Sequence, residues 1–85
     1  MRKFEFSPRA HGELKFWRAN SAKTAERVLK LLLECAEHPE RGSGKPEQLR
    51  FDLAGCWSRR IDKKNRLVYW FNDDTVFVVS LRNHY

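Results

Sequence analysis

The chain has 85 residues, which leaves room for one modest hydrophobic core, so we expect a single domain over residues 1–85. Seventeen Lys and Arg residues stand against 11 Asp and Glu residues, a formal net charge of +6. Residues 1–42 carry nine bases and six acids, and residues 43–85 carry eight and five, so each half is +3 and the charge belongs to the folded body rather than to a tail. Such a body suggests a polyanionic target or a small acidic protein partner.

The sequence gives no signal for membrane insertion, export or a metal site. Its longest apolar runs, Leu67–Phe71 and Val76–Val79, are far shorter than the ~18 residues of a membrane span. Charged residues interrupt the first 20 positions, unlike a signal peptide, so we expect a cytoplasmic protein. Cys35 and Cys56 are too few and too isolated for a disulfide framework or a zinc site, and we expect two reduced, half-buried thiols and no cofactor.

The N-terminal segment predicts a strand followed by a helix. Residues Arg2–Ser7 alternate between polar and apolar side chains, which is typical of a short strand. Ser7 then offers an N-cap, and Pro8 suits the first helical position. We expect this helix to end near Arg18–Asn20.

A second helix should begin at a cap formed by Asn20 or Ser21 and end at His38-Pro39. Its apolar stripe, at spacings of three and four residues, comprises Ala25, Val28 or Leu29, Leu32, and Cys35 or Ala36. Leu31 and Leu33 fall off this stripe. They either widen the buried face or contact a partner.

The second half of the chain predicts strands. A loop over Glu40–Pro46 precedes four strand-like segments separated by short polar turns. These segments are Glu47–Leu53, Cys56–Asp62, Arg66–Phe71 and Thr75–Arg82. The order β-α-α-β-β-β-β predicts an α+β fold, in which two N-terminal helices pack on one face of an antiparallel sheet.

The turn lengths predict which side chains share a face of this sheet. A three-residue loop over Asn72–Asp74 would pair Phe71 with Thr75 and Arg66 with Ser80. In this register, the side chains that face the helices are apolar: Leu67, Tyr69, Phe71, Phe77, Val79 and Leu81. The side chains on the opposite face are those of Arg66, Ser80, Arg82 and His84.

A second three-residue loop, Lys63–Asn65, would extend the same pattern to the preceding strand. Ser58 and Arg60 would join the face away from the helices, and Arg59 would point toward them. Which of the two neighbouring arginines meets a ligand depends on both turn lengths. The face that the helices leave uncovered is therefore expected to be strongly cationic.

A cationic face with a histidine and a carboxylate nearby meets the needs of metal-independent RNA cleavage. A base must take the proton of a ribose 2′-OH, an acid must protonate the leaving 5′-oxygen, and cations must offset the charge on the phosphate. Glu47, His84 and Arg66 could fill these roles. On residue types alone, a generic basic binding module remains ahead of a nuclease.

Four stretches of the chain resemble the YoeB/Txe family of bacterial toxins, within the RelE/ParE superfamily. They are Gly44-Lys-Pro-Glu47, Leu53-x-Gly55-x-Trp57-Ser-Arg-Arg-Ile61, Arg66-Leu-Val-Tyr69 and the terminal His84-Tyr85. The central run is specific when it occurs together with the terminal His-Tyr, and the match covers essentially the whole chain. The resemblance implies a microbial-RNase-like fold and a ribosome-dependent endoribonuclease that cleaves mRNA in the ribosomal A site.

The same resemblance implies roles for single residues. Glu47 would be the general base, His84 the general acid and Arg66 the phosphate clamp, and Tyr85 would help to place the substrate. Further contacts with the RNA backbone would come from Arg60 and, more weakly, from Lys45 and Arg50. Arg82, which the strand register places on the same cationic face, is also expected to bind RNA.

The expected partners are the 70S ribosome, mRNA and a YefM/Phd-like antitoxin that is acidic and partly disordered. Whether the chain also forms a homodimer stays open. Two alternatives remain: a ParE-like toxin that acts on a protein target, and a non-catalytic basic RNA-binding module.

Overall fold

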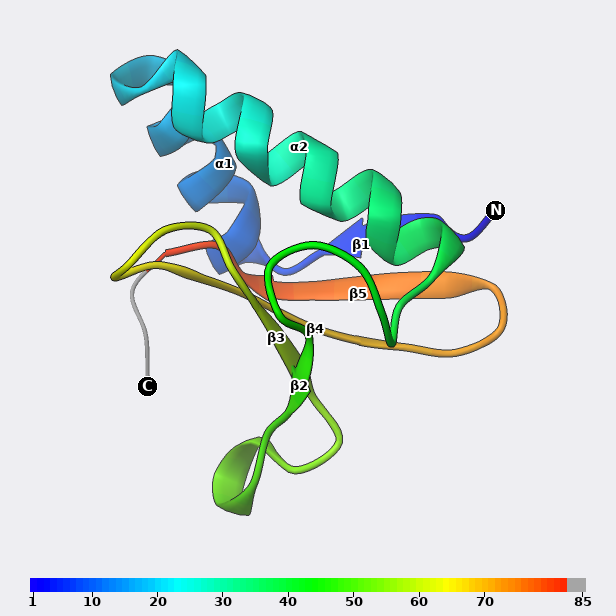
Figure 1. The fold of residues 1–85 in the computed structure, drawn as a ribbon. Coiled ribbons are helices and arrows are strands. Elements are labelled where there is room, and N and C mark those ends of the chain that lie inside the picture. Colours follow the sequence, from blue (N-terminus) through cyan, green and yellow to red (C-terminus); the bar gives the residue numbers. More distant parts are fainter. Residues whose placement is uncertain (83–85) are drawn as a thin grey trace.

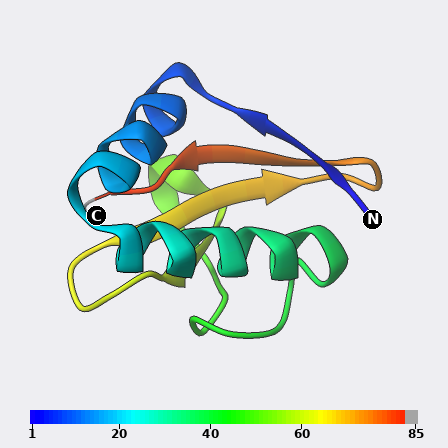
Figure 2. The same cartoon turned by 90° about the horizontal axis from the view of Figure 1, so that it is seen from above.

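Five strands form one sheet in the order β1-β5-β4-β3-β2, and two helices cover one of its faces (Figure 1). This computed structural model describes residues 1–82. The elements are β1 (Lys3–Phe6), α1 (Pro8–Asn20), α2 (Ala22–Glu37), β2 (Glu47–Gln48), the 3₁₀ helix η1 (Phe51–Leu53), β3 (Trp57–Arg60), β4 (Arg66–Phe71) and β5 (Thr75–Ser80). The α+β class and the element order predicted from the sequence are confirmed. Seen from above, both helices lie over the sheet (Figure 2).

Both helices begin at the serine caps that the sequence predicts. The Ser7 side chain accepts a hydrogen bond from the Ala10 backbone N–H at 3.0 Å, and Pro8 opens α1. The Ser21 side chain accepts from the Thr24 N–H at 3.2 Å, so Ser21 rather than Asn20 caps α2. Each cap satisfies a backbone donor that a helix start would otherwise leave unpaired. Neither of these helices is long and apolar enough to cross a membrane.

The core lies between α2 and the covered face of the sheet. Its fully buried members are chiefly Val28, Leu31, Leu32 and Cys35 from α2, with Leu67, Tyr69, Val76, Val78 and Leu81 from the sheet side. Leu31 therefore widens the buried face, whereas Leu33 remains 55% exposed. Cys35 is buried rather than half-buried, and burial raises the pKa of its thiol to about 11. Cys56 is half-buried as predicted, and both thiols are free.

The turn between β4 and β5 is tighter than the three-residue loop that the sequence suggested. Phe71 pairs with Val76, and the Asn72 N–H donates to the Thr75 carbonyl. The loop between these paired residues is therefore only Asp73–Asp74. The Asn72 side-chain oxygen accepts hydrogen bonds from the backbone N–H groups of Asp74 and Thr75 at 2.8 and 2.9 Å. This local side-chain bonding stabilises the short turn, and the predicted pairing of Phe71 with Thr75 is wrong.

One residue fewer in the turn reverses the faces of the first half of β5. Val76 and Val78 enter the core instead of Phe77 and Val79. Phe77 instead stacks on Trp70, with ring centres 3.8 Å apart and planes at 9°. The expectation that Phe77 and Val79 form the covered face is therefore wrong.

An irregularity further along the ladder restores the predicted faces. Tyr69 pairs with Val78, but Val68 pairs with Ser80, so Val79 is an extra residue on β5. Such a bulge reverses the alternation once more. Leu81 consequently enters the core as predicted, although Ser80 faces Val68 and not Arg66.

Two further strand expectations are corrected. β1 pairs in parallel with β5, so the sheet is mixed, whereas β2 to β5 pair antiparallel as expected. The predicted strand Glu47–Leu53 retains only Glu47–Gln48. Phe51 has a φ of 59°, and this left-handed residue turns the chain into η1. The loop carrying η1 projects away from the helices (Figure 1).

A fully buried arginine joins β3 to the loop that precedes β2. The Arg59 guanidinium donates to the Tyr69 hydroxyl and to the carbonyls of Ser43, His38 and Arg41 at 3.2, 3.2, 2.6 and 2.9 Å, and its Nη1 lies 3.5 Å from Glu34 Oε1. No other side chain type offers so many donors in a fixed plane. Arg59 is therefore the arginine on the covered side of the sheet, as the alternation predicts, and it holds the loop that leads to Glu47.

Glu34 contributes a pH-dependent part of this linkage. Its Oε1 accepts from the Ser43 N–H at 2.7 Å, and this bond, together with Arg59 and Lys30, outweighs partial burial and lowers the pKa of Glu34 below 4.5. A carboxyl whose pKa is lowered in the folded state stabilises the fold above its unfolded pKa, and this stabilisation is lost as the pH falls. We expect the free energy of unfolding to decline below pH 4.5, and less steeply in Glu34→Gln.

Urea denaturation at neutral pH and at successive values below 4.5 measures this difference. Glu37→Gln, which changes an exposed carboxylate on the same helix, is the matched control. Parallel pH profiles for the wild type and Glu34→Gln would contradict the assignment.

Candidate active site

A pocket of about 170 Å³ opens where β2, β3 and β4 lie side by side. Its lining residues are Lys45, Glu47, Leu49, Ser58, Arg60 and Arg66. Strand pairing brings these positions together, because Glu47 lies opposite Ser58 and Arg60 lies opposite Arg66. Segments separated by about 20 residues in the sequence thus contribute to one site.

The two arginines of the pocket lie side by side. Arg60 and Arg66 are directly opposite each other on neighbouring strands, where like charges destabilise a sheet. Within residues 1–82, neither guanidinium has a carboxylate oxygen within 4.0 Å. Two adjacent guanidinium groups without a carboxylate partner suit a phosphate, whose oxygens match their planar donor geometry.

The turn between β3 and β4 orients Arg66. Its Nη1 donates to the carbonyls of Asp62 and Asn65 at 2.8 and 3.2 Å. The Asp62 carboxylate accepts from the backbone N–H groups of Lys64 and Asn65 at 2.8 and 2.7 Å. Burial raises the pKa of Asp62, but the hydrogen bonds from Asn65 and Lys64 and the nearby Arg66 lower it overall. An ionised Asp62 thus stabilises the turn that positions the Arg66 side chain.

Glu47 supplies the carboxylate of the pocket. Its Oε1 lies 3.5 Å from Lys45 Nζ, and both side chains are more than half exposed. The chain reaches this position through two left-handed residues, Gly44 with φ 82° and Lys45 with φ 54°. The Gly44 carbonyl accepts from the Arg60 N–H at 2.6 Å, and a Cβ at Gly44 would lie 3.0 Å from Arg59 Cβ. Glycine is therefore required where the loop meets β3.

The structure separates the other predicted site residues from this pocket. Arg50 is exposed and leads into η1 on the projecting loop (Figure 1). The guanidinium carbon of Arg82 lies 3.7 Å from the ring centre of Phe16 on α1, so this side chain rests on the helix layer. His84 and Tyr85 lie outside the described residues. The pocket therefore gathers Lys45, Glu47, Arg60 and Arg66.

Two lining residues had no assigned role in the sequence-based prediction. Ser58 is 8% exposed and lies opposite Glu47. Alternation had placed Ser58 on this face, and that signal was sufficient to include it in the site. Leu49 has no comparable signal, because its position depends on how the chain leaves β2, where its N–H donates to the Cys56 carbonyl at 2.9 Å.

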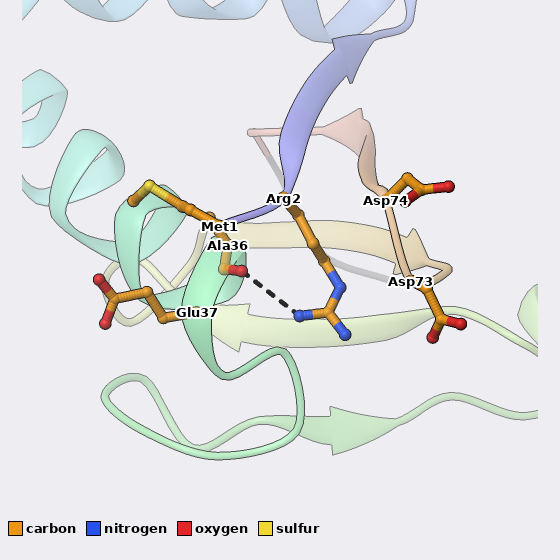
Figure 3. A pocket seen from close by; sticks show the side chains of 6 residues that line it. All are labelled: Met1, Arg2, Ala36, Glu37, Asp73 and Asp74. Atoms are coloured by element: carbon orange, nitrogen blue, oxygen red, sulfur yellow. Dashed lines mark hydrogen bonds between the residues drawn. The ribbon is translucent and has the colours of Figure 1, made fainter.

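A larger hollow of about 620 Å³ lies elsewhere on the molecule, next to the N-terminus (Figure 3). It is lined by Met1, Arg2, Ala36, Glu37, Asp73 and Asp74. Its one arginine, Arg2, donates to the carbonyls of Asn72 at 2.7 Å and of Ala36 at 3.4 Å, so it secures the start of the chain. Over residues 1–82, no three His, Cys, Asp or Glu side chains gather as a metal site would require. The smaller pocket, which contains Glu47 beside two arginines, is therefore the better candidate for an active site.

The fold and this pocket define a small basic α+β protein that carries two adjacent arginines and a carboxylate on the free face of its sheet, the face that the helices leave uncovered. Residues 6–85 match the family model of the YoeB-like toxin of bacterial type II toxin-antitoxin system. The chain is 46% identical to Toxin YoeB of Mycobacterium bovis over 85 residues, which cover 100% of this chain and 100% of that one. It therefore belongs to the YoeB family of toxins.

Solved structures of family members share the fold. The YoeB dimer from Staphylococcus aureus superposes with a TM-score of 0.92 at 34% identity, covering 99% of this chain and 98% of that one. YoeB in the heterotetrameric YoeB-YefM toxin-antitoxin complex from Staphylococcus aureus superposes with a TM-score of 0.91 at 34% identity, covering 100% and 99%. The fold is thus that of the microbial-RNase-like toxins, as the resemblance implied.

Proposed function

We propose that this toxin is a ribosome-dependent endoribonuclease that cleaves mRNA in the ribosomal A site. The observation that supports this most is the placement of Glu47 in one pocket with two arginines, neither of which has a carboxylate oxygen within 4.0 Å among residues 1–82. A binding module needs only the positive charge. Transfer of a phosphoryl group also needs a base close to the phosphate site, and Glu47 fits that requirement.

In this mechanism Glu47 takes the proton from a ribose 2′-OH, whose oxygen attacks the adjacent phosphorus. A bond from phosphorus to the 2′-oxygen forms while the bond to the 5′-oxygen breaks, which leaves a 2′,3′-cyclic phosphate and a free 5′-OH. Arg66 and Arg60 offset the charge that builds on the phosphate oxygens. We assign His84 as the acid that protonates the 5′-oxygen and Tyr85 as a residue that places the substrate, both on the family resemblance.

The openness of the site supports a role for the ribosome. Glu47 and Lys45 are more than half exposed, so these side chains do not enclose a bound RNA strand. Holding the 2′-OH in line with the breaking bond lowers the barrier by removing orientational freedom. The ribosome, which presents mRNA in a defined path, supplies this orientation, and we assign the cytoplasm as the place of action.

The same surface also suits an antitoxin. The Staphylococcus aureus relatives are complexed with YefM. For this chain we propose a YefM/Phd-like antitoxin whose acidic, partly disordered segment folds over the arginine pocket. Leu33, 55% exposed on α2, is a candidate apolar anchor, whereas the buried Leu31 is excluded as one. By analogy with the Staphylococcus aureus dimer, we also propose that the chain forms a homodimer.

Substituting Arg66 should separate activity from stability. Arg66→Gln removes a phosphate ligand, so cleavage should be lost. The free energy of unfolding should stay within about 1 kcal/mol of the wild type, because relief of the like-charge pair with Arg60 offsets the loss of hydrogen bonds to the Asp62 and Asn65 carbonyls. Urea denaturation and a cleavage assay on translating ribosomes, run on the same preparations, measure both quantities. A large loss of stability would show that Arg66 is mainly structural.

The decisive experiment maps mRNA 5′ ends in cells that express this chain without an antitoxin, next to cells that express His84→Ala. New ends inside open reading frames, in codon register and absent in the variant, are the expected result. Intact mRNA in growth-arrested cells would indicate a ParE-like toxin with a protein target. Intact mRNA with normal growth would leave only a basic RNA-binding module.

A further inference from the structure

A second feature of the free sheet face is an exposed aromatic pair. Trp70 on β4 is 43% exposed and stacks on Phe77 of β5, with ring centres 3.8 Å apart and planes at 9°. What sets Trp70 apart from the other exposed apolar residues is the parallel stacking on a second ring, because such a pair offers a flat aromatic surface. The pair borders a hollow of about 200 Å³ that also involves residues 5–7 at the end of β1.

The pair shares its face with the arginine pocket. Leu67 and Tyr69 of β4 are in the core, so Arg66, Val68 and Trp70 alternate to the other side. Trp70 follows Arg66 by four residues, which places it about 13 Å farther along the strand. A few nucleotides of an extended single strand cover such a distance. An RNA whose phosphate lies at Arg66 can therefore reach Trp70 with a neighbouring base.

The charge around the pair favours a neutral planar ligand. Glu5 on β1 lies opposite Phe77, and Asp73–Asp74 forms the turn beyond Trp70. These carboxylates would repel a phosphate and would equally repel an acidic antitoxin segment. The exposed part of the Trp70 indole suits a nucleobase, because every base offers a π-face and stacking tolerates any sequence.

We infer that Trp70, supported by Phe77, is a stacking site for one base of the mRNA, to one side of the bond that is cleaved. This inference rests on the proposed function, which places the RNA phosphates at the arginine pocket, but it concerns RNA binding rather than RNA cleavage. The phosphates stay at Arg60 and Arg66, and the base extends along the sheet to the aromatic pair. The subsite thus adds affinity without sequence selection.

The test uses Glu47→Gln as the parent protein, so that the RNA remains intact, and measures the affinity for short single-stranded oligoribonucleotides by fluorescence anisotropy. Trp70→Ala should weaken binding about tenfold, and Trp70→Tyr should restore most of the loss. An abasic nucleotide is then moved along the RNA. At one position in the RNA, the abasic nucleotide should weaken binding to the parent protein about tenfold. At that position it should have no effect on binding to Trp70→Ala, because the missing base and the missing indole remove the same contact.

Leu29→Ala is the matched control, because Leu29 is an exposed apolar residue on α2, across the sheet from Trp70. Equal affinities of the parent and Trp70→Ala, or abasic penalties that are the same in both proteins, would overturn the inference. A Trp70→Ala variant that binds RNA normally but binds the antitoxin or a second copy less tightly would overturn it in favour of a protein interface. If Trp70 binds RNA as expected while the wild-type chain leaves mRNA intact on ribosomes, the stacking site stands and the proposed function fails.

Discussion

Replacing Glu47 with glutamine is expected to slow mRNA cleavage on the ribosome by about 10²- to 10⁴-fold, the usual contribution of a positioned base. Glutamine keeps the shape of the side chain but cannot accept the 2′-OH proton. Because Glu47 is exposed and its one described ion pair, with Lys45, is also exposed, the free energy of unfolding should change little. A reconstituted translation reaction with a single mRNA, followed by primer extension, measures the rate.

The matched control is Glu26→Gln, which removes an equally exposed carboxylate from α2. Its cleavage rate should equal that of the wild type, so that a general effect of net charge is separated from the loss of the base. Full activity in Glu47→Gln would mean that another group removes the proton, and Glu47 would then be no more than a surface residue near the arginines.

The second large effect is expected for the neighbouring arginines of β3, which lie on opposite faces of the sheet. Arg59→Met should lower the free energy of unfolding by about 3–5 kcal/mol, because it strands the Glu34 carboxylate and several carbonyl oxygens that Arg59 now satisfies. For a chain of this size, each kcal/mol lowers Tm by about 4–8 °C. Arg59→Lys should rescue little, since one ammonium cannot reproduce the fork of the guanidinium.

Arg60→Met provides the comparison, one position along the same strand. Its side chain is exposed and makes no ion pair with a described carboxylate, so the stability should stay within about 0.5 kcal/mol of the wild type while cleavage falls. Thermal unfolding and the ribosome cleavage assay distinguish the two variants. Similar melting temperatures for Arg59→Met and Arg60→Met would contradict the structural role of Arg59.

Local chemistry explains which parts of the fold could be predicted. A serine that can accept a backbone hydrogen bond defines a helix start wherever the chain goes afterwards, and Ser7 and Ser21 both do so. Alternation along a strand likewise needs no partner, so Arg60 and Arg66 were correctly predicted to share a face. The roles assigned to Glu47, His84 and Tyr85 came from the family resemblance and remain predictions.

The pairing of β5 could not be predicted, because turns of two and three residues are both compatible with the run Asn72-Asp-Asp-Thr75. The side-chain oxygen of Asn72 selects the shorter turn, and this reverses Val76–Val78. The bulge at Val79 then restores the alternation, so Ser80 kept its predicted side although its pairing partner differed. The turn that is one residue shorter and the bulge that adds one residue therefore cancel at the end of β5.

By itself the sequence determined the element order, the cap of the first helix, the cationic residues of the free face and the family. These depend on charge, on local hydrogen bonding and on the period of apolar residues, all of which are properties of neighbours along the chain. Only the tertiary structure decided that Arg59 is a buried anchor while Arg60 lines the pocket with Glu47, and that Phe77 lies beneath Trp70. The positions of these side chains depend on contacts between segments far apart in the sequence. Such contacts form only when the strands pair and the loops pack against them.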